Sequence, residues 1–480
     1  MDVRSFSAAA LDHARRAGIR CASVRVDEVR KSELLLLDGV VWSMHDRVEA
    51  GLSVRVWHEG AWGFAADGNG GNARSVVDRA LRMARHCAKI GSREAEPVDE
   101  PAHGEVEWSS GFRLNPFEVP ESARVALLAD WSARLLAARV VEHVRAGVVA
   151  VQERKHYADL DGTTATQQRV RVHPQVTVMG SVASVRTQGP PVARGWEYLT
   201  GDGWDWDAEL AALPELLEGK QCAVPVTAGT YDLVIAPSNL WLTVHESVGH
   251  ATELDRALGH EASYAGSTFV RPEDVGSLRY GSDLMNVTAD RTTPHALATV
   301  GFDDEGVAAQ SWDLVRDGVL VGVQTDRRTA AVVGAARSTG CAFAESALRP
   351  VLARMPNVSL APADGGPTTE ELISTVTDGI YLAGADSWSI DSRRHNFQFT
   401  AQQAYRISGG QLAGQLSGVA YQSATPDFWN ALSAVGGRET YQVFGADLCG
   451  KGQPVQAAAT SHGCPAALFA GVRVVNTGAA

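Results

Sequence analysis

The sequence predicts an α+β protein: an N-terminal α/β region of antiparallel strands with long helices, followed by a C-terminal β-rich domain resembling a sandwich or barrel. In the first half, segments of alternating apolar residues are mixed with stretches of helical spacing. From residue 229 onward, most segments are short apolar runs separated by glycine, which is typical of a β domain. The chain has 480 residues, 45% of them hydrophobic, so two or three domains are expected.

The first half is expected to begin with a helix over residues 7–17 that ends at Gly18. Glu59-Gly60, between Trp57 and Trp62, is predicted to be a hairpin turn. The remaining expected elements are strands over 21–26 and 52–57, a helix around 76–84, a polar connector over 92–116, a helix over 121–138, strands over 140–145, 148–155, 168–172 and 175–179, and a linker over 188–225 containing a short helix at 208–217.

The second half is expected to begin with a buried strand over 229–236. Ser238 then fits the N-cap of a helix that carries His245. We place the main domain boundary near residue 222, which gives domains 1–222 and 223–480. The later expected elements are strands over 296–302, 310–315, 319–323, 397–399, 404–408 and 412–416, interrupted by one helix over 368–376.

Composition excludes several classes of protein. The net charge of −13 repels phosphate backbones, and no local basic patch is evident, so we expect no nucleic-acid partner. No apolar run approaches the roughly 18 residues that a membrane helix needs, and no secretory signal is evident at the start. The six cysteines are too sparse for a disulfide framework. We therefore expect a cytoplasmic protein without membrane contact.

The most informative stretch is Val244-His-Glu-Ser-Val-Gly-His250. Two imidazoles flanking a carboxylate can bind zinc and activate a water. The two histidines are five residues apart, and in a regular α-helix this spacing separates them by about 140°, against about 40° for a spacing of four. A regular helix therefore cannot present both to one ion. We predict a π-bulge or a helix end at 248–250, which Gly249 would ease.

Two ligands are too few for catalytic zinc, which usually takes three protein ligands plus a water. Spacing alone does not choose the third. Nearby candidates are Glu253, His260 and Glu261, and distant candidates are Cys449, His462 and Cys464.

With these residues in view, the chain resembles the TldD/PmbA family, on the TldD side, from about residue 50 to 478. The HExxxH pattern together with a late Cys-Gly-Lys is the specific part of this resemblance. The matching segments are Gly51–Val56, Thr230–Ile235, His245–His250, Gly301–Gly306, Gly379–Tyr381, Phe397–Thr400 with Ala404-Tyr405, and Cys449–Gln453.

The resemblance implies that the C-terminal domain carries one Zn²⁺ per active subunit, held by His245, His250 and Cys449, with Glu246 as general base. It also implies hydrolysis of extended, unstructured peptides. It further implies a homodimer, or a heterodimer with a PmbA-like subunit. The chemistry agrees, because two imidazoles and a thiolate leave zinc a fourth position for a water whose proton Glu246 can take.

Two other functions stay open. One is a metallo-amidohydrolase that tailors a small peptide-like conjugate in a biosynthetic pathway. The other is a non-catalytic, PmbA-like partner subunit, against which the intact HExxxH and Cys449 speak.

The sequence also suggests roles for residues outside the proposed ligand set. Glu253 is expected to orient His250 from one turn away. His462 is either close to the substrate or a turn histidine, and Cys464 is expected to be a packed thiol. Asp303-Asp-Glu-Gly306 is interpreted as a hairpin turn rather than a cation loop. Arg394 either belongs to a solvated edge or holds a substrate carboxylate.

Overall fold

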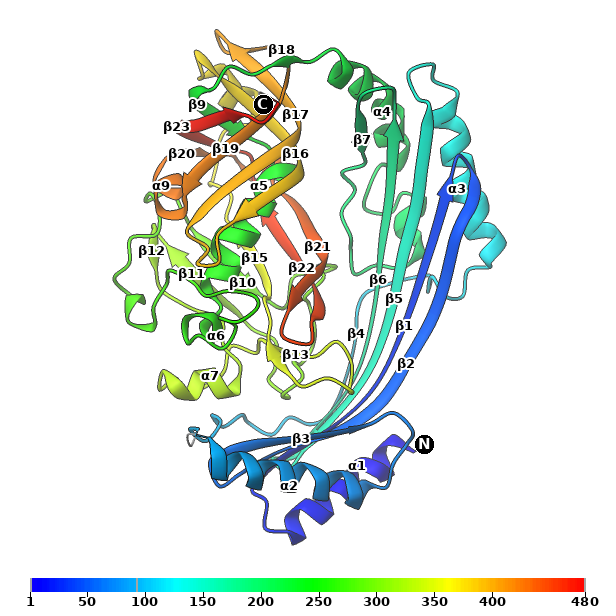
Figure 1. Ribbon diagram of the computed structural model, residues 1–480, viewed down its shortest axis with the longest axis vertical. Helices are drawn as coiled ribbons and strands as arrows, with labels where there is room; N and C mark the ends of the chain where they lie inside the picture. The colour runs from blue at the N-terminus through cyan, green and yellow to red at the C-terminus, as the bar shows by residue number, and fades with distance from the viewer. Residues whose placement is uncertain (1, 92–93, 479–480) are drawn as a thin grey trace.

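The computed structural model describes residues 2–91 and 94–478, so the first two residues of the predicted 92–116 connector lie outside the described part. Long strands form a curved sheet along one side of the molecule, and the C-terminal half lies beside it (Figure 1). The α+β class predicted from the sequence is confirmed.

The N-terminal sheet has the strand order β3-β2-β1-β5-β6-β4, with β7 also paired to β6. Several predicted strands were too short or divided, because residues 143–155 and 168–179 each belong to a single long strand, while residues 140–142 precede the first of these strands. The predicted connector also contains a strand, β4. The hairpin turn at Glu59-Gly60 is confirmed, since Trp57 pairs with Trp62. The strands are β1 (Cys21–Leu37), β2 (Val40–His58), β3 (Ala61–Asp67), β4 (Gly104–Ser109), β5 (His143–Asp159), β6 (Thr163–Met179) and β7 (Ser184–Arg186).

Two pairs of helices cover this sheet at its two ends. At one end, α1 (Val3–Arg16) and α2 (Ala73–Ile90) bury apolar residues such as Leu11 and Leu81 against β1 and β2. At the other end, α3 (Glu121–Leu136) and α4 (Trp206–Gln221) pack Trp131 and Trp206 into a separate core. The short helix η1 (Trp196–Thr200) contributes side chains to the same core.

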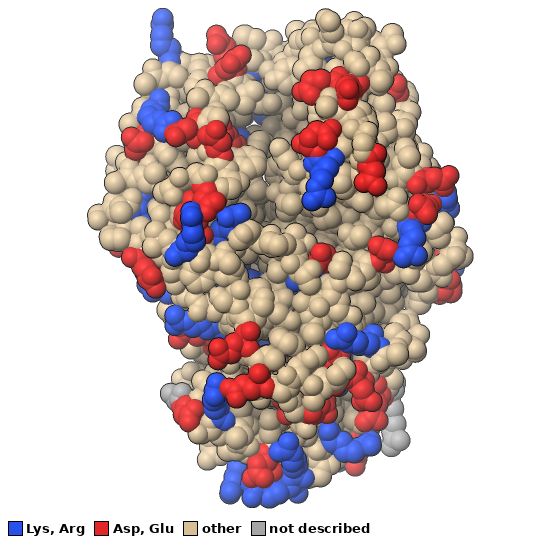
Figure 2. Space-filling view, turned by 180° about the vertical axis from the view of Figure 1, so that it is seen from behind, with Lys and Arg blue, Asp and Glu red and all other residues tan. Residues whose placement is uncertain are grey.

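One end of the molecule exposes more basic side chains than the rest of the face in Figure 2. The blue side chains of Figure 2 gather at the lower end of the molecule, where α1 and α2 lie. These helices expose Arg15, Arg16, Arg82, Arg85 and Lys89, and Arg16 is paired there with the exposed Asp12. Elsewhere on this face, basic and acidic residues are interspersed (Figure 2).

The centre of the C-terminal half is a closed barrel of strands, in which β16 pairs with β9, then β23, β19 and β17 follow, and β17 pairs back to β16. Closure removes sheet edges and encloses an apolar core. The bounds are β8 (Val224–Pro225), β9 (Gly229–Ile235), β16 (Asp378–Ile390), β17 (Asn396–Ser408), β18 (Gln411–Ser417), β19 (Val419–Ala424), β20 (Leu432–Val435) and β23 (Ala467–Asn476).

Smaller sheets and short helices surround the barrel. The strands are β10 (Val287–Asp290), β11 (Ser311–Arg316), β12 (Val319–Leu320), β13 (Ala342–Phe343), β14 (Leu352–Ala353), β15 (Asn357–Leu360), β21 (Gln442–Lys451) and β22 (Gln456–Cys464). The helices are α5 (Pro237–Val244), η2 (His245–Gly249), η3 (His250–Thr252), α6 (Leu254–Ala257), η4 (Pro272–Asp274), α7 (Arg327–Val332), α8 (Thr369–Ser374), α9 (Thr425–Asn430) and η5 (Arg438–Thr440).

Four local predictions for this half were wrong, the first being the division of residues 397–408, which belong to the single strand β17. Residues 296–302 form no strand, and only Phe302 takes part in an isolated bridge. Ser238 lies inside α5 and accepts a hydrogen bond from Gly384 N at 2.9 Å, while Ala236 is the N-cap. Several helices besides the predicted 368–376 interrupt the strands.

The turn predicted at Asp303–Gly306 is confirmed by the antiparallel bridge between Phe302 and Ala308. Its carboxylates join the two halves, since Lys155 Nζ on β5 lies 2.7 Å from Asp304 Oδ2. No helix among the described residues is long and apolar enough to cross a membrane. The N-terminal sheet ends before residue 222 and the other sheets begin after it, but the domain boundary itself stays a proposal.

Candidate metal centre

The segment carrying the two histidines leaves the α-helical path, as their spacing predicts. Helix α5 continues directly into a π-helical turn, η2, in which His250 N donates to His245 O, five residues earlier. The wider turn brings the two imidazoles together, with ring centroids 4.7 Å apart. The predicted irregularity is therefore confirmed.

Neighbouring side chains stabilise this turn. Gln324 Nε2 donates to Gly249 O at 2.6 Å, and the Tyr280 hydroxyl donates to Ser247 O. Gly249 has an ordinary helical φ of −53°, so glycine is not required there by the backbone conformation. A Cβ there would meet the end of the Met355 side chain, so a larger residue would need this flexible side chain to move.

Cys449, on β21, completes a group of three donors. One ligand atom each from His245, His250 and Cys449 lies within 4.8 Å of the others, and all three residues are buried. Cys449 Sγ lies 3.4 Å from His250 Nε2. Within the described ranges, this is the one group of three or more His, Cys, Asp or Glu donors close enough to share an ion.

Hydrogen bonds fix which nitrogen of each histidine faces the group. His462 Nδ1 must donate to Val358 O, 2.9 Å away, because a carbonyl only accepts. His462 Nε2 therefore accepts from His245 Nδ1 at 2.7 Å. His250 Nδ1 donates to Glu253 Oε2 at 2.8 Å. Both His245 and His250 are thus left with a free Nε2 lone pair.

Protonation favours metal binding. Burial lowers the pKa of His250 to about 4, so its imidazole is neutral near pH 7. Burial alone would raise the pKa of the Cys449 thiol, but neighbouring His250 and Arg354 lower it to about 7. Two neutral imidazoles and an acidified thiol are a donor set that fits a transition-metal ion such as zinc.

Glu253 lies at the centre of a buried charge network behind His250. It accepts from Arg256 Nε at 2.6 Å and from Lys451 Nζ at 3.0 Å. Lys451 is fully buried and also bonds Asp255 Oδ1 and Ala353 O, each at 2.8 Å. The predicted orienting position of Glu253 thus has a geometric basis, while the roles of Arg256 and Lys451 were missed. The one sequence signal for the role of Lys451 was its place in the Cys-Gly-Lys segment.

Glu246 and Arg394 lie together at the metal centre. Arg394 Nη1 donates to Glu246 Oε2 at 2.6 Å, so the solvated-edge interpretation of Arg394 is wrong. Both residues line a cavity of about 490 Å³ together with His245, His250 and Cys449. The Nε of Arg394 is buried without a hydrogen-bond partner among the described residues.

The remaining candidates lie outside the group of three donors. His462 is buried within β22, so the turn interpretation is wrong, and its ring stacks on Trp241. Cys464 is packed against Pro237 O, with Sγ 3.5 Å away. His260 is exposed, and Glu261 accepts from Gly452 N at 3.1 Å.

Comparison with known proteins gives this geometry a context. A family model described as the PmbA/TldA metallopeptidase C-terminal domain matches residues 228–476, and the corresponding domain 1 model matches residues 22–84. The chain belongs to the PmbA/TldD family. It is accordingly a metallopeptidase.

Individual relatives are distant but extend over long segments. A metalloprotease of Methanothermobacter thermautotrophicus is 26% identical over 91% of this chain and 92% of its own length. A zinc metalloprotease TldD homologue of Saccharolobus solfataricus is 27% identical over 49% of this chain and 50% of its own. The crystal structure of TldE from Thermococcus kodakarensis shares the fold with a TM-score of 0.70 at 17% identity, covering 97% of this chain and 100% of that one.

Proposed function

We propose that this member of the PmbA/TldD family is a zinc-dependent peptidase that hydrolyses amide bonds of extended, unstructured peptides. The observation that carries the proposal is the buried group of His245, His250 and Cys449 beside Glu246 in one cavity. The name of the Saccharolobus relative favours zinc as the ion. We assign one zinc ion to each active subunit.

His245 and His250 would hold the ion through Nε2, and Cys449 through Sγ. When bound, zinc supplies Lewis acidity, which acidifies water and polarises the carbonyl that is attacked. Glu246 follows a ligand directly in the chain and lines the same cavity. Its carboxylate takes a proton from the attacking water and delivers it to the leaving amine.

Arg394 positions this base. Because its guanidinium holds Glu246 Oε2, Oε1 is the oxygen left to accept the proton. The Arg394 side chain also lines the cavity, so we assign to it the binding of a carbonyl or carboxylate oxygen of the substrate.

The walls of the cavity favour an extended substrate. Residues 186–191 line one side and residues 444–450 of β21 line the other. In the described structure β21 pairs only with β22, so its second edge is free to hydrogen-bond an added strand. A folded protein would not reach a centre whose ligands are this deeply buried.

We also propose that the chain acts as a homodimer or with a PmbA-like subunit. Residues 40–51 of β2 pair on one side only, with β1. This edge exposes Val40, Trp42 and Val48, and proteins rarely leave such an edge uncovered. A molar mass in solution equal to one chain, with and without a PmbA-like protein, would contradict this proposal.

The central test combines peptide hydrolysis with metal analysis. Zinc-loaded protein is incubated with unstructured peptides and the products are identified by mass spectrometry. Glu246→Gln is expected to keep its zinc and to lose about 10²- to 10⁴-fold in rate. Glu273→Gln, on the exposed η4, is the matched control. A Glu246→Gln enzyme with full activity would remove this residue from the mechanism.

A further inference from the structure

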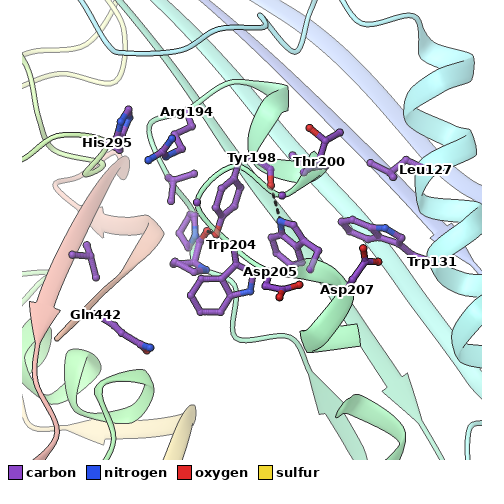
Figure 3. Close-up of a pocket in the computed structure, with 18 of the residues that line it drawn as sticks. Leu127, Trp131, Arg194, Tyr198, Thr200, Trp204, Asp205, Asp207, His295 and Gln442 are labelled. Atoms are coloured by element: carbon purple, nitrogen blue, oxygen red, sulfur yellow. Dashed lines mark hydrogen bonds between the residues drawn. The ribbon is translucent and has the colours of Figure 1, made fainter. Parts of the chain in front are cut away.

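A second, larger cavity lies beside the metal cleft and has no role in the chemistry above. It encloses about 1010 Å³ between the α3–α4 region and β21. Trp131, Tyr198 and Trp204 approach it from one side, and Gln442 lies across from them (Figure 3).

The cavity shares two wall segments with the metal cleft. Pro190 and Pro191 line both cavities. Strand β21 also runs through both, because residues 442–443 line the larger cavity and residues 444–450 line the metal cleft. A peptide extended along β21 would therefore pass from this cavity to Cys449. Val443 precedes Cys449 by six residues, which corresponds to roughly 20 Å of extended chain.

The shared wall is held in place before any ligand binds. The Tyr198 hydroxyl donates to Pro190 O at 2.9 Å. Glu209, on α4, accepts from Trp204 Nε1 at 2.5 Å and from Gly189 N at 3.2 Å. A site with fixed walls loses little conformational entropy when a ligand binds.

Aromatic rings form part of the cavity lining. Trp131 and Trp206 are buried and stacked, with ring centroids 5.3 Å apart, and form the floor. Trp206 Nε1 is satisfied by Tyr198 O at 2.7 Å (Figure 3). Trp204 is only half-buried. Its ring lies edge-on to that of Phe444 of β21, with ring centroids 6.2 Å apart. Trp204 thus lies where the cavity meets the strand.

The cations around the cavity are already paired. Arg134 Nη1 lies 2.7 Å from Asp207 Oδ1, and Arg194 Nη1 lies 3.4 Å from Asp202 Oδ1. Their charges are therefore offset, and the half-buried Trp204 supplies the accessible aromatic surface, beside the buried Pro190 and Pro191. Such a lining binds a flat apolar group better than an anion.

We propose that this cavity is a distal subsite of the peptidase. It binds a large apolar side chain, aromatic by preference, about six residues from the bond that is cleaved. This inference rests on the proposed peptidase function. It deepens that function by adding a substrate requirement: an extended segment long enough to reach both cavities.

The test uses zinc-loaded protein and a set of unstructured peptides in which one tryptophan is moved a position at a time. Hydrolysis is expected to be fastest when the tryptophan is about six residues from the cleaved bond. Trp204→Ala is expected to remove this maximum, lowering kcat/KM roughly threefold to tenfold, mainly through KM. Peptides too short to reach the cavity should be cleaved equally by both proteins.

Two further variants keep the test decisive. Trp312→Ala removes a half-buried tryptophan outside both cavities and should leave the maximum in place. Val443→Trp fills the cavity from the strand side and should abolish the maximum even if Trp204→Ala does not fold. A rate that ignores the tryptophan position, or an equal loss on short peptides, would overturn the subsite.

Binding separates this inference from the proposed function. The Glu246→Gln protein is titrated with the same peptides by calorimetry. Position-dependent binding without any hydrolysis by the wild type would support the subsite and contradict the peptidase. Hydrolysis whose rate does not depend on the tryptophan position would support the peptidase and contradict the subsite.

Discussion

Lys451 Nζ lies 3.0 Å from Glu253 Oε1 in the interior of the protein. This ion pair joins the two parts of the metal centre, because Lys451 follows Cys449 on β21 and Glu253 holds His250 Nδ1. The ligands from two distant segments are therefore fixed relative to each other by buried charges as well as by packing.

We predict that Lys451→Met weakens zinc binding roughly 10- to 100-fold, the range typical for loss of groups that orient ligands. Glu253 and Asp255 would lose their shared cation, so the free energy of unfolding should also fall by about 3–5 kcal/mol. Competition with a zinc chelator and urea unfolding measure the two effects. Lys89→Met, exposed on α2, is the control. Wild-type zinc affinity in Lys451→Met would show that the pair does not position the ligands.

We predict that His462→Phe also lowers zinc affinity by about 10- to 100-fold. Phenylalanine cannot accept the proton of His245 Nδ1, so the imidazole loses the bond that keeps Nε2 free. His462→Gln retains an acceptor oxygen and should lose less. If Phe and Gln variants bind zinc equally well, the hydrogen bond is unimportant for the tautomer of His245.

Much of the metal centre could be predicted because its decisive feature is local. A spacing of five between His245 and His250 excludes a regular helix on geometry alone, and the π-turn follows. The third ligand is different, since Cys449 lies 199 residues from His250. Only tertiary structure, or the family resemblance, distinguishes it from Cys464. The charges around Glu253 are equally non-local.

The long strands were harder to recognise than the helices. Gly147 and Pro174 interrupt the apolar pattern of β5 and β6, and the sequence was divided at both. In the sheet Gly147 pairs with Gln175 and Pro174 pairs with Val148, so both strands continue through these positions. On its other side, β6 pairs with β4 only up to Gln168 and with β7 only from Thr177. Pro174 therefore lies where these two strands require no backbone donor.

We predict that Cys449→Ala no longer holds one zinc ion per chain, whereas Cys464→Ala does. Both thiols are buried, so the pair separates ligation from packing. Metal analysis after dialysis gives the stoichiometry. In the cobalt-substituted protein, the thiolate-to-metal absorption band should disappear in the Cys449 variant alone. The opposite pattern would move the third ligand to Cys464.

The last prediction concerns the contact between the N-terminal sheet and the metal strand. Arg171, on β6, bonds Glu153 of β5 and Asp447 of β21, the latter at 2.9 Å from Nε. Burial would raise the pKa of Glu153, but the charges of Arg169 and Arg171 outweigh burial and hold it well below the ordinary value of 4.5. A carboxylate with a lowered pKa in the folded state stabilises the protein above its unfolded pKa and loses this contribution as the pH falls.

Glu153→Gln should therefore lower the free energy of unfolding at pH 7 by about 3–5 kcal/mol, because two buried guanidinium groups lose their anion. Below about pH 4.5 the difference in the free energy of unfolding between this variant and the wild type should shrink. The reason is that the Glu153 carboxylate of the unfolded wild-type chain then takes up a proton, which favours unfolding. Urea unfolding of metal-free protein at a series of pH values measures both effects without a contribution from zinc release. Glu107→Gln, on the exposed side of β4, should follow the wild-type curve. Parallel curves for Glu153→Gln and the wild type would mean that this ion pair does not supply the acid sensitivity of the contact.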